Sequence, residues 1–230
     1  MMHFPRLQDN EVHIHCLPLA SGSSHHVSPD EMQRAGQLQE QHKREQFLAA
    51  RGLLRTILGS YLGTEPEELQ FAMGENGKPH LSGSGGRDEQ IHFNLSHSGA
   101  LFLLAVAADR EVGIDAEQLL DDTPIHNMAR LAFSPREQSE LFALPGHLQR
   151  SAFYRCWTRK EACLKVCGLG FALRPNSFDV SLEAESQTLS FIPNYGSSWF
   201  LQDIAVPAGY CAALATKGPP PVVNYMQPCS

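Results

Sequence analysis

The stretch from Ile91 to Lys165 constrains the fold of this chain more than any other part of its sequence. It contains three blocks with different periodicity, which read IHFNLSHSGA, EVGIDAE and FYRCWTRKEACLK. In the first two blocks β-branched or aromatic residues alternate with small or polar ones, which predicts strands. In the third block apolar residues recur every three or four positions, which predicts a helix. The fold must therefore bring two strands and a helix together in the middle of the chain.

Three acidic side chains are expected to meet where these elements pack. Asp115 and Glu117 are two residues apart on a strand, so both carboxylates leave the same face with Cα atoms about 6–7 Å apart. On the helix, Trp157, Glu161 and Lys165 are spaced four residues apart and form one stripe. If the helix lies over the end of the strand, three carboxylates and an ammonium group converge. Such a group suits Mg²⁺ or Mn²⁺ that holds phosphate oxygens, with a lysine nearby.

Composition excludes several classes of protein. With 230 residues and 42% apolar content, the chain can bury one large core or two small ones. It begins without an apolar stretch of signal-peptide length and has no run approaching the roughly 18 apolar residues of a membrane span, so we expect a cytoplasmic protein without a membrane partner. The six cysteines form no C-x-x-C pair, which favours reduced thiols. The net charge of -7 argues against a general nucleic-acid binder.

A weak internal repeat predicts two similar halves. Residues 47–63 resemble residues 153–170 in their helix-then-glycine pattern, and residues 99–107 resemble residues 209–216. We expect an α+β, pseudo-duplicated, two-lobed fold in which each half is a long helix packed on a small antiparallel sheet. The predicted boundaries are an N-terminal lobe at 1–110, a C-terminal lobe at 111–217 and a flexible tail at 218–230. The cleft between the lobes should be lined by His97, Asp115, Glu117 and Glu161.

Local patterns place further elements. The alternating pattern from Glu11 predicts an edge strand. The motifs SPDE at Ser28 and SPRE at Ser134 are capping boxes with proline at the first helical position, so a helix begins at each. Residues 43–63 predict a second helix, which carries Arg44 and Arg51. In the second half, residues 178–182, 189–192 and 199–206 predict strands.

Four of these motifs, taken in order, resemble a known family. They are GKP (77–79), FNLSHS (93–98), VGIDAE (112–117) and WTRKEACLK (157–165), and the similarity extends from Lys43 to Arg174. Their order and spacing resemble the 4'-phosphopantetheinyl transferases, specifically the Sfp-type, two-lobed monomeric branch. The resemblance implies an enzyme that uses coenzyme A and Mg²⁺. It would move the phosphopantetheine arm onto a serine of an acyl or peptidyl carrier protein and release 3',5'-ADP.

The resemblance also implies roles for individual residues. The metal ligands would be Asp115, Glu117 and Glu161. The catalytic group would consist of Asp115, Glu161 as the simplest base, and Lys165 near the pyrophosphate. The nucleotide end of coenzyme A would contact Lys78, Pro79, Ser96 and His97, with Arg44 and Arg51 as candidates for the ribose phosphate. Because carriers of this kind are acidic around their serine, Arg155, Arg159 and Lys160 form our predicted docking surface.

Two other functions stay open at this level. Three carboxylates and a lysine also serve a Mg²⁺-dependent phosphohydrolase or nucleotidyl transferase, in which water or a sugar hydroxyl attacks. A non-catalytic module that binds coenzyme A or a carrier is the other alternative, but binding alone gives no reason for Asp115, Glu117 and Glu161 to occur together. The sequence does not identify the carrier, which could serve fatty acid, polyketide or siderophore synthesis.

Overall fold

The computed structural model describes residues 4–74, 77–82, 91–167, 173–183, 187–189 and 199–226. Its helices within these residues are α1 (Pro29–Gly36), α2 (Gln41–Leu62), α3 (Ile125–Ala132), α4 (Pro135–Ala143) and α5 (Gly146–Cys167). The strands of the first half are β1 (Glu11–Pro18), β2 (Phe71–Met73), β3 (Pro79–Leu81), β4 (His92–Ser98) and β5 (Leu101–Ala107). Those that follow are β6 (Val112–Gln118), β7 (Gln187–Leu189), β8 (Trp199–Asp203), β9 (Tyr210–Lys217) and β10 (Val222–Tyr225).

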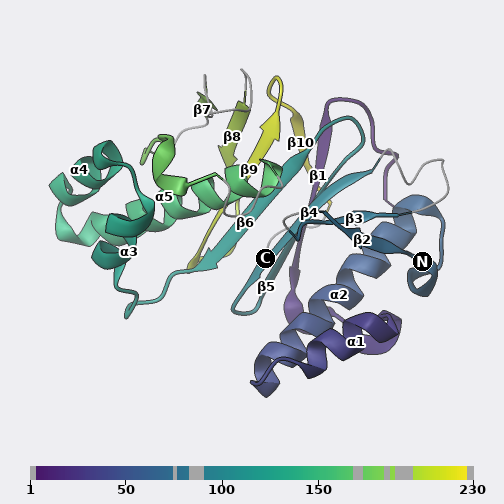
Figure 1. Ribbon diagram of the computed structural model, residues 1–230. Helices are drawn as coiled ribbons and strands as arrows, with labels where there is room; N and C mark the ends of the chain where they lie inside the picture. The colour runs from purple at the N-terminus through teal and green to yellow at the C-terminus, as the bar shows by residue number, and fades with distance from the viewer. Residues whose placement is uncertain are drawn as a thin grey trace.

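The described strands form two four-stranded sheets, one in each half of the molecule (Figure 1). The first has the order β10-β1-β5-β4 and the second the order β6-β9-β8-β7, while β2 and β3 pair separately. Helices α1 and α2 lie with the first sheet, and α3, α4 and α5 lie with the second (Figure 1). The predicted α+β architecture, a long helix with a small sheet in each half, is confirmed.

Alternation along the strands explains how these layers pack. Strand β5 is buried at all seven positions because both of its faces are covered. Phe102, Leu104 and Val106 face the apolar side chains of α2. The intervening residues Leu103 and Ala105 pack against the second sheet instead. The molecule is therefore layered as α2, first sheet, second sheet and α5.

The predicted helix starts are confirmed by their hydrogen bonds. In α1 the Ser28 hydroxyl accepts from the Glu31 amide, and the Glu31 carboxylate accepts from the Ser28 amide. Ser134 and Glu137 make the same reciprocal pair before α4. Helix α2 ends at Gly63, whose φ of 68° is the left-handed conformation that favours glycine. Each half therefore contains a short helix that begins with a capping box and precedes the long helix.

The flexible tail that the sequence predicts is wrong for part of its length. Val222–Tyr225 forms β10, which pairs in parallel with β1, so β1 is an interior strand and not the predicted edge. The amide of Met226 extends this pairing by donating to Ile14 O at 2.9 Å. Without β10, one side of β1 would expose a row of unpaired backbone groups. Because this partner strand lies at the far end of the chain, local sequence patterns do not reveal it.

The strand predicted at residues 178–182 is also wrong. Phe178, Val180 and Leu182 are buried against α5, which produces the alternating pattern, but the backbone forms no ladder there. Its carbonyl oxygens accept instead from side chains of α5. Lys160 Nζ donates to Phe178 O at 2.6 Å, and Arg159 donates to Ser181 O at 2.8 Å.

These contacts overturn the predicted carrier-docking surface. Arg159 and Lys160 are 0% and 1% exposed, so neither is available to a partner. Arg159 is paired with Asp203 at 2.7 Å and Lys160 with Glu137 at 2.8 Å. Arg155 donates to the carbonyl of Leu182 at 2.8 Å. The basic residues of α5 hold the surrounding segments to the helix and do not form a solvated face.

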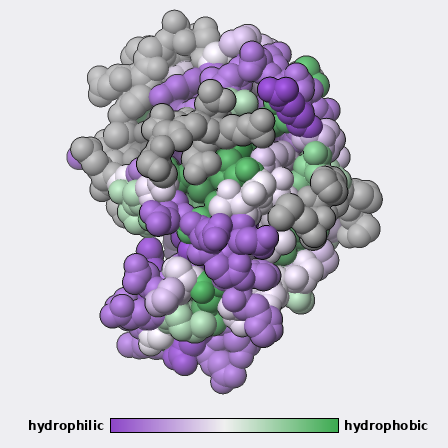
Figure 2. All heavy atoms as spheres, turned by 90° about the vertical axis from the view of Figure 1, so that its right-hand side faces the viewer, coloured by the Kyte–Doolittle hydropathy of each residue, from purple (hydrophilic) through white to green (hydrophobic). Residues whose placement is uncertain are grey.

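The surface is predominantly polar on the side that carries the N-terminal helices. Figure 2 shows hydrophilic side chains over most of this face, with apolar ones visible in smaller areas. In the described residues we find no helix with both the length and the apolar character that crossing a membrane requires.

Candidate active site

Helix α5 crosses β6 at a position that requires glycine. A Cβ atom on Gly113 would lie 2.1 Å from Ala162 O and 2.6 Å from the Val166 amide nitrogen. The absence of this atom lets the helix backbone approach the strand closely. Asp115 is two residues further along the same face of the strand. The close crossing therefore brings the side chain of Lys165 onto Asp115.

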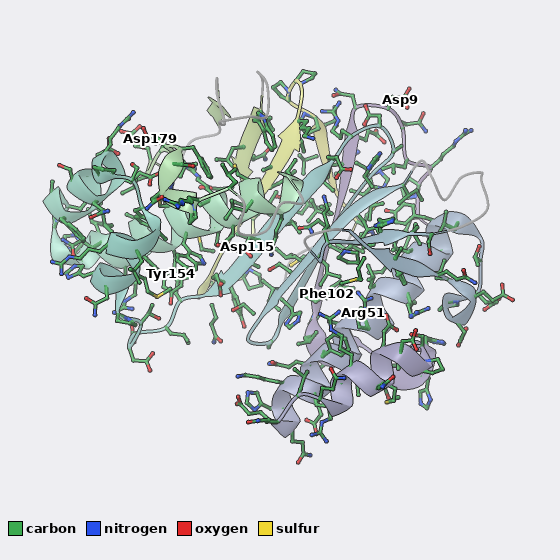
Figure 3. The ribbon with its side chains drawn as sticks, in the orientation of Figure 1. Asp9, Arg51, Phe102, Asp115, Tyr154 and Asp179 are labelled. Atoms are coloured by element: carbon green, nitrogen blue, oxygen red, sulfur yellow. The ribbon has the colours of Figure 1, made fainter. Side chains whose placement is uncertain are left out.

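The ion pair between Lys165 and Asp115 lies at the centre of the site. Lys165 Nζ donates to Asp115 Oδ1 at 2.7 Å, to Ser96 Oγ at 3.0 Å and to Ile114 O at 3.0 Å. Asp115 is only 4% exposed, and it lies near the middle of the molecule between the two halves (Figure 3). Its second oxygen, Oδ2, is buried and has no hydrogen-bond partner among the residues that the structure describes. This oxygen is available to a cation.

Strand β4 supplies hydrogen bonds to the acidic strand. It ends the first sheet and β6 begins the second, and the links between them come from side chains. Asn94 Oδ1 accepts from the Ile114 amide at 2.8 Å. The Ser96 hydroxyl donates to Asp115 Oδ1 at 3.0 Å, and that of Ser98 donates to Glu117 Oε2 at 2.9 Å. The first half thus contacts both acids of β6.

Glu117 and Glu161 have perturbed acidities. Burial raises the pKa of Glu117, and the negative charge of Asp115 raises it further, against smaller opposing effects of hydrogen bonds from Ser98 and Trp157 and of the charge on Lys165. Burial also raises the pKa of Glu161, again with Asp115 as the next largest cause. Crowded carboxylates of this kind are stabilised by a positive ion between them.

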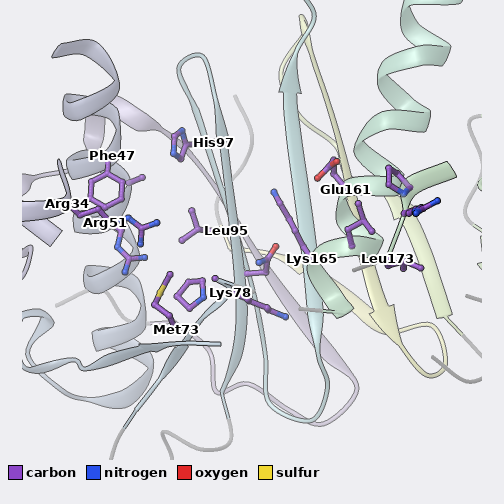
Figure 4. Close-up of a pocket in the computed structure, with 17 residues that line it drawn as sticks. Arg34, Phe47, Arg51, Met73, Lys78, Leu95, His97, Glu161, Lys165 and Leu173 are labelled. Atoms are coloured by element: carbon purple, nitrogen blue, oxygen red, sulfur yellow. The ribbon is translucent and has the colours of Figure 1, made fainter. Parts of the chain in front are cut away.

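A cavity of about 570 Å³ opens beside Glu161 and Lys165 (Figure 4). His97 and Glu161 belong to its lining, but Asp115 and Glu117, which were also expected there, do not. Glu161 and Lys165 reach it from α5, whereas Arg51 and Phe47 reach it from α2, and His97 and Leu95 come from β4 (Figure 4). Its lining consists of Arg34, Phe47, Ala50, Arg51, Met73, Gly77, Lys78, Pro79, Asn94, Leu95, His97, Glu161, Leu164, Lys165, Leu173, Arg174 and Pro175. Both halves therefore contribute to one cavity.

The structure separates the nucleotide-binding candidates into two groups. Lys78, Pro79, His97 and Arg51 line the cavity. Ser96 is not part of the lining, because its hydroxyl points to the acids on β6. Arg44 is also absent from the lining, and its guanidinium donates to Leu38 O at 2.9 Å.

Several cavity cations already have protein partners. Lys78 Nζ donates to Glu111 Oε2 at 2.7 Å and to Val112 O at 3.0 Å. Arg51 pairs with Glu31 at 2.6 Å. Burial lowers the pKa of His97, and the charge on Lys165 lowers it further, so its imidazole is neutral near pH 7. His97 therefore offers a hydrogen bond to an anion and not a positive charge.

Sequence reasoning missed most of the apolar lining and two cations. The apolar residues include Met73, Leu95 and Leu173, and the cations are Arg34 on α1 and Arg174. Strand alternation could have identified Leu95, since it shares a face with His97. No motif marks Arg34, because the cavity it reaches is formed by segments distant in sequence.

The metal site that the sequence predicts is not preformed. Among the described residues, no three His, Cys, Asp or Glu side chains are grouped closely enough to hold an ion. Asp115 and Lys165 instead form the ion pair described above.

The sequence matches two family profiles that together span most of the chain. Residues 21–109 match the N-terminal profile of 4'-phosphopantetheinyl transferase, and residues 111–215 match the 4'-phosphopantetheinyl transferase superfamily. The 4'-phosphopantetheinyl transferase HetI of Nostoc sp. is 36% identical over 219 residues, covering 92% of this chain and 90% of the relative. Sfp of Bacillus subtilis is 27% identical over 194 residues, covering 84% and 83%.

A similar protein also occurs in a vertebrate. The L-aminoadipate-semialdehyde dehydrogenase-phosphopantetheinyl transferase of Xenopus laevis is 28% identical over 204 residues, which cover 82% of this chain and 68% of the relative.

Proposed function

The chain belongs to the 4'-phosphopantetheinyl transferase superfamily, and from this membership we propose that its reaction takes place where the cavity residues Glu161 and Lys165 adjoin the buried Asp115. The protein is a transferase that moves the 4'-phosphopantetheine arm of coenzyme A to a carrier protein. The observation that supports this position of the reaction is the buried, unpartnered Oδ2 of Asp115 beside the cavity residues Glu161 and Lys165.

The two halves divide the work in this proposal. His97, Arg51, Lys78 and Pro79 would hold the phosphorylated nucleotide of coenzyme A, since they line the first-half side of the cavity. The second half would carry out the chemistry with the acids of β6 and α5. Arg44 is not assigned to nucleotide binding in this proposal, because it lies outside the cavity lining and donates to Leu38 O.

Mg²⁺, or Mn²⁺ in its place, fits the donor set. Asp115, Glu117 and Glu161 would hold it, because they supply hard oxygen ligands and because the buried Oδ2 of Asp115 lacks a partner. Burial first, and the nearby charge of Asp115 second, raise the pKa values of Glu117 and Glu161, and a bound cation would offset both effects. When bound, the ion neutralises charge on the pyrophosphate oxygens.

The side chains of this protein account for the proton and the leaving group. Glu161 removes the proton of the carrier serine, directly or through a water it orients, as the serine Oγ attacks the β-phosphorus of coenzyme A. A raised pKa makes Glu161 a better base near neutral pH. The bond from phosphorus to the bridging oxygen breaks, and 3',5'-ADP leaves with the electron pair. Lys165 stabilises the negative charge that develops on the phosphate of the leaving 3',5'-ADP.

Mass spectrometry of an apo carrier incubated with coenzyme A tests this function. We expect the carrier serine to gain a phosphopantetheine group and 3',5'-ADP to appear in equal amount, only when the carrier is present. Release of nucleotide without a carrier would indicate the phosphohydrolase or nucleotidyl transferase that the sequence left open. Binding without any product would indicate a non-catalytic module.

The remaining properties stay predictions of the sequence. They are a monomeric state, a cytoplasmic location and the absence of nucleic-acid and membrane partners. The pathway is to be read from the carrier that is modified most rapidly, whether it serves fatty acid, polyketide or siderophore synthesis. The carrier-docking surface lies elsewhere than Arg155, Arg159 and Lys160, since the latter two are buried and the first is bound to Leu182 O.

A further inference from the structure

Two serines on β4 face two acids on β6 in the same register. Ser96 donates to Asp115 and Ser98 donates to Glu117, each across 19 positions of the chain. Serine and acid both recur at every second residue, so both pairs lie on matching faces of the two strands. Because this match links the edges of two separate sheets, we expect the two hydroxyl groups to have the same effect on their carboxylates.

The hydroxyl of Ser96 helps to saturate one oxygen of Asp115. Oδ1 accepts from Ser96 at 3.0 Å and from Lys165 at 2.7 Å, whereas Oδ2 is buried without a partner. Ser96 is 8% exposed, so bulk water does not readily replace its hydroxyl. The carboxylate is therefore held with one oxygen occupied and the other available.

The hydroxyl of Ser98 has a fixed direction. It accepts from the Gln118 amide at 3.0 Å, so its own proton is free to point to Glu117 Oε2 at 2.9 Å. Glu117 is thus held by a donor from β4.

We propose that Ser96 and Ser98 are positioning residues that set both the affinity and the selectivity of the cation site. This inference rests on the proposed binding of Mg²⁺ by Asp115 and Glu117. Each hydroxyl occupies one oxygen of its carboxylate, which disfavours binding of one ion by both oxygens of that carboxylate. Ca²⁺ commonly uses such bidentate carboxylates, whereas Mg²⁺ takes six ligands in a compact octahedron. The serines therefore favour the smaller ions over Ca²⁺.

Titration of the folded proteins with Mn²⁺, followed by electron paramagnetic resonance, tests this inference without measuring activity. Ser98→Ala and Ser96→Ala should each weaken Mn²⁺ binding about 10-fold or more, the range found when partners of metal ligands are removed. Competition with Ca²⁺ should show that Ca²⁺ affinity falls much less. Ser98→Thr keeps the hydroxyl on a strand position that tolerates threonine, so it should bind Mn²⁺ like the parent protein.

Two further variants separate the possible failures. Asn94→Ala loosens the contact between β4 and β6 through the Ile114 amide without touching a carboxylate, so it should lower thermal stability and leave Mn²⁺ affinity unchanged. If Asp115→Ala binds Mn²⁺ like the parent protein, the proposed metal site itself is wrong. If Asp115→Ala loses binding while both serine variants keep the parent affinity and Ca²⁺ selectivity, only the positioning role is overturned. Equal losses in Ser98→Ala and Ser98→Thr would overturn it as well.

Discussion

Helices α2 and α5 are attached to their neighbours by the same device. Each has 22 residues and follows a shorter helix that begins with a capping box. The glutamate of each capping box also forms an ion pair with a positively charged side chain of the long helix. Glu31 binds Arg51 at 2.6 Å and Arg55 at 2.7 Å, and Glu137 binds Lys160 at 2.8 Å. The duplicated halves thus share a buried ionic contact as well as an arrangement of elements.

The two helices differ in what they present to the cavity. Helix α2 packs on its sheet through large apolar residues, including Leu54 and Ile57, and its Arg51 places a positively charged side chain in the cavity lining. α5 crosses β6 at Gly113, and this close contact brings Glu161 and Lys165 to the acids of the strand. A common scaffold therefore carries a base for an anion on one side and hard oxygen ligands with a lysine on the other. This difference is the basis of our proposal that the first half binds the nucleotide and the second half carries out the chemistry.

The largest effect should come from removing acids of the second half. We expect Asp115→Ala and Glu161→Ala each to lower the rate of transfer about a thousandfold or more, because each removes an oxygen ligand of the proposed Mg²⁺, whose charge would neutralise the reacting phosphate. Glu117→Ala should be milder if water replaces the lost oxygen. The measurement is single-turnover modification of an apo carrier at saturating coenzyme A. Circular dichroism should show an unchanged fold, and full activity of Asp115→Ala would refute the site assignment.

Stability should distinguish the two capping-box glutamates. Glu137 is 0% exposed and its loss leaves Lys160 buried without a counter-charge, so Glu137→Ala should lower the free energy of unfolding by about 3–5 kcal/mol. Glu31→Ala should cost less. Arg55 keeps its bonds to Pro66 O and Leu69 O, and the partly exposed Arg51 can reach water. Urea denaturation measures both changes, and a larger loss in Glu31→Ala would contradict the ranking.

Local chemistry made much of this arrangement predictable. Proline and glutamate after Ser28 and Ser134 fix the helix starts, and the alternation in VGIDAE fixes the common face of Asp115 and Glu117. The same reasoning failed where a side chain finds its partner far away in the chain. Bases on a helix usually lie in solvent, but here Lys160 neutralises Glu137 and binds backbone carbonyls.

The contact between α5 and residues 178–182 explains two wrong predictions. Lys160 and Arg159 replace the neighbouring strand that residues 178–182 would otherwise need, so both the predicted strand and the predicted docking surface failed together. The tail failed for a similar reason, since the edge that β10 covers belongs to the first strand of the chain. In each case the missing information was a contact between distant segments and not a local propensity.

The nucleotide side of the comparison should respond to loss of an anion contact. We expect His97→Ala and Arg51→Ala to weaken binding of coenzyme A about 10–100-fold, with a much smaller effect on dephospho-coenzyme A and on turnover at saturation. Calorimetric titration of each variant with both ligands gives the comparison. Arg44→Ala is the matched control, because Arg44 lies on α2 but outside the cavity lining. An equal loss for the two ligands would mean that the residue does not contact the ribose phosphate.

The smallest expected effect is on the pH dependence of the free energy of unfolding, and it comes from the sheet faces that α2 and α5 cover. Under α5 the second sheet presents apolar residues such as Leu201 and Ala213. Under α2 the first sheet presents His13 and His15, whose rings lie 2.8 and 2.9 Å from the Tyr61 hydroxyl. Burial and, to a smaller extent, the charge of the neighbouring His13 lower the pKa of His15 to about 3. The first half should therefore be the acid-sensitive one.

The sign follows from proton binding by the two states. Below about pH 6.5 the unfolded chain binds a proton at His15, whereas the folded protein does not until about pH 3. The free energy of unfolding therefore decreases as the pH is lowered from about 6.5 to about 3. Each pH unit costs about 1.4 kcal/mol from this group. Because the raised pKa values of Glu117, Glu137 and Glu161 act in the opposite direction, the parent must be compared with His15→Gln. Between pH 7 and 5.5 the parent should lose about 1–2 kcal/mol more than the variant in urea denaturation. His42→Gln, on an exposed ring, is the control, and parallel pH profiles for the parent and His15→Gln would show that the His15 ring takes no part in acid sensitivity.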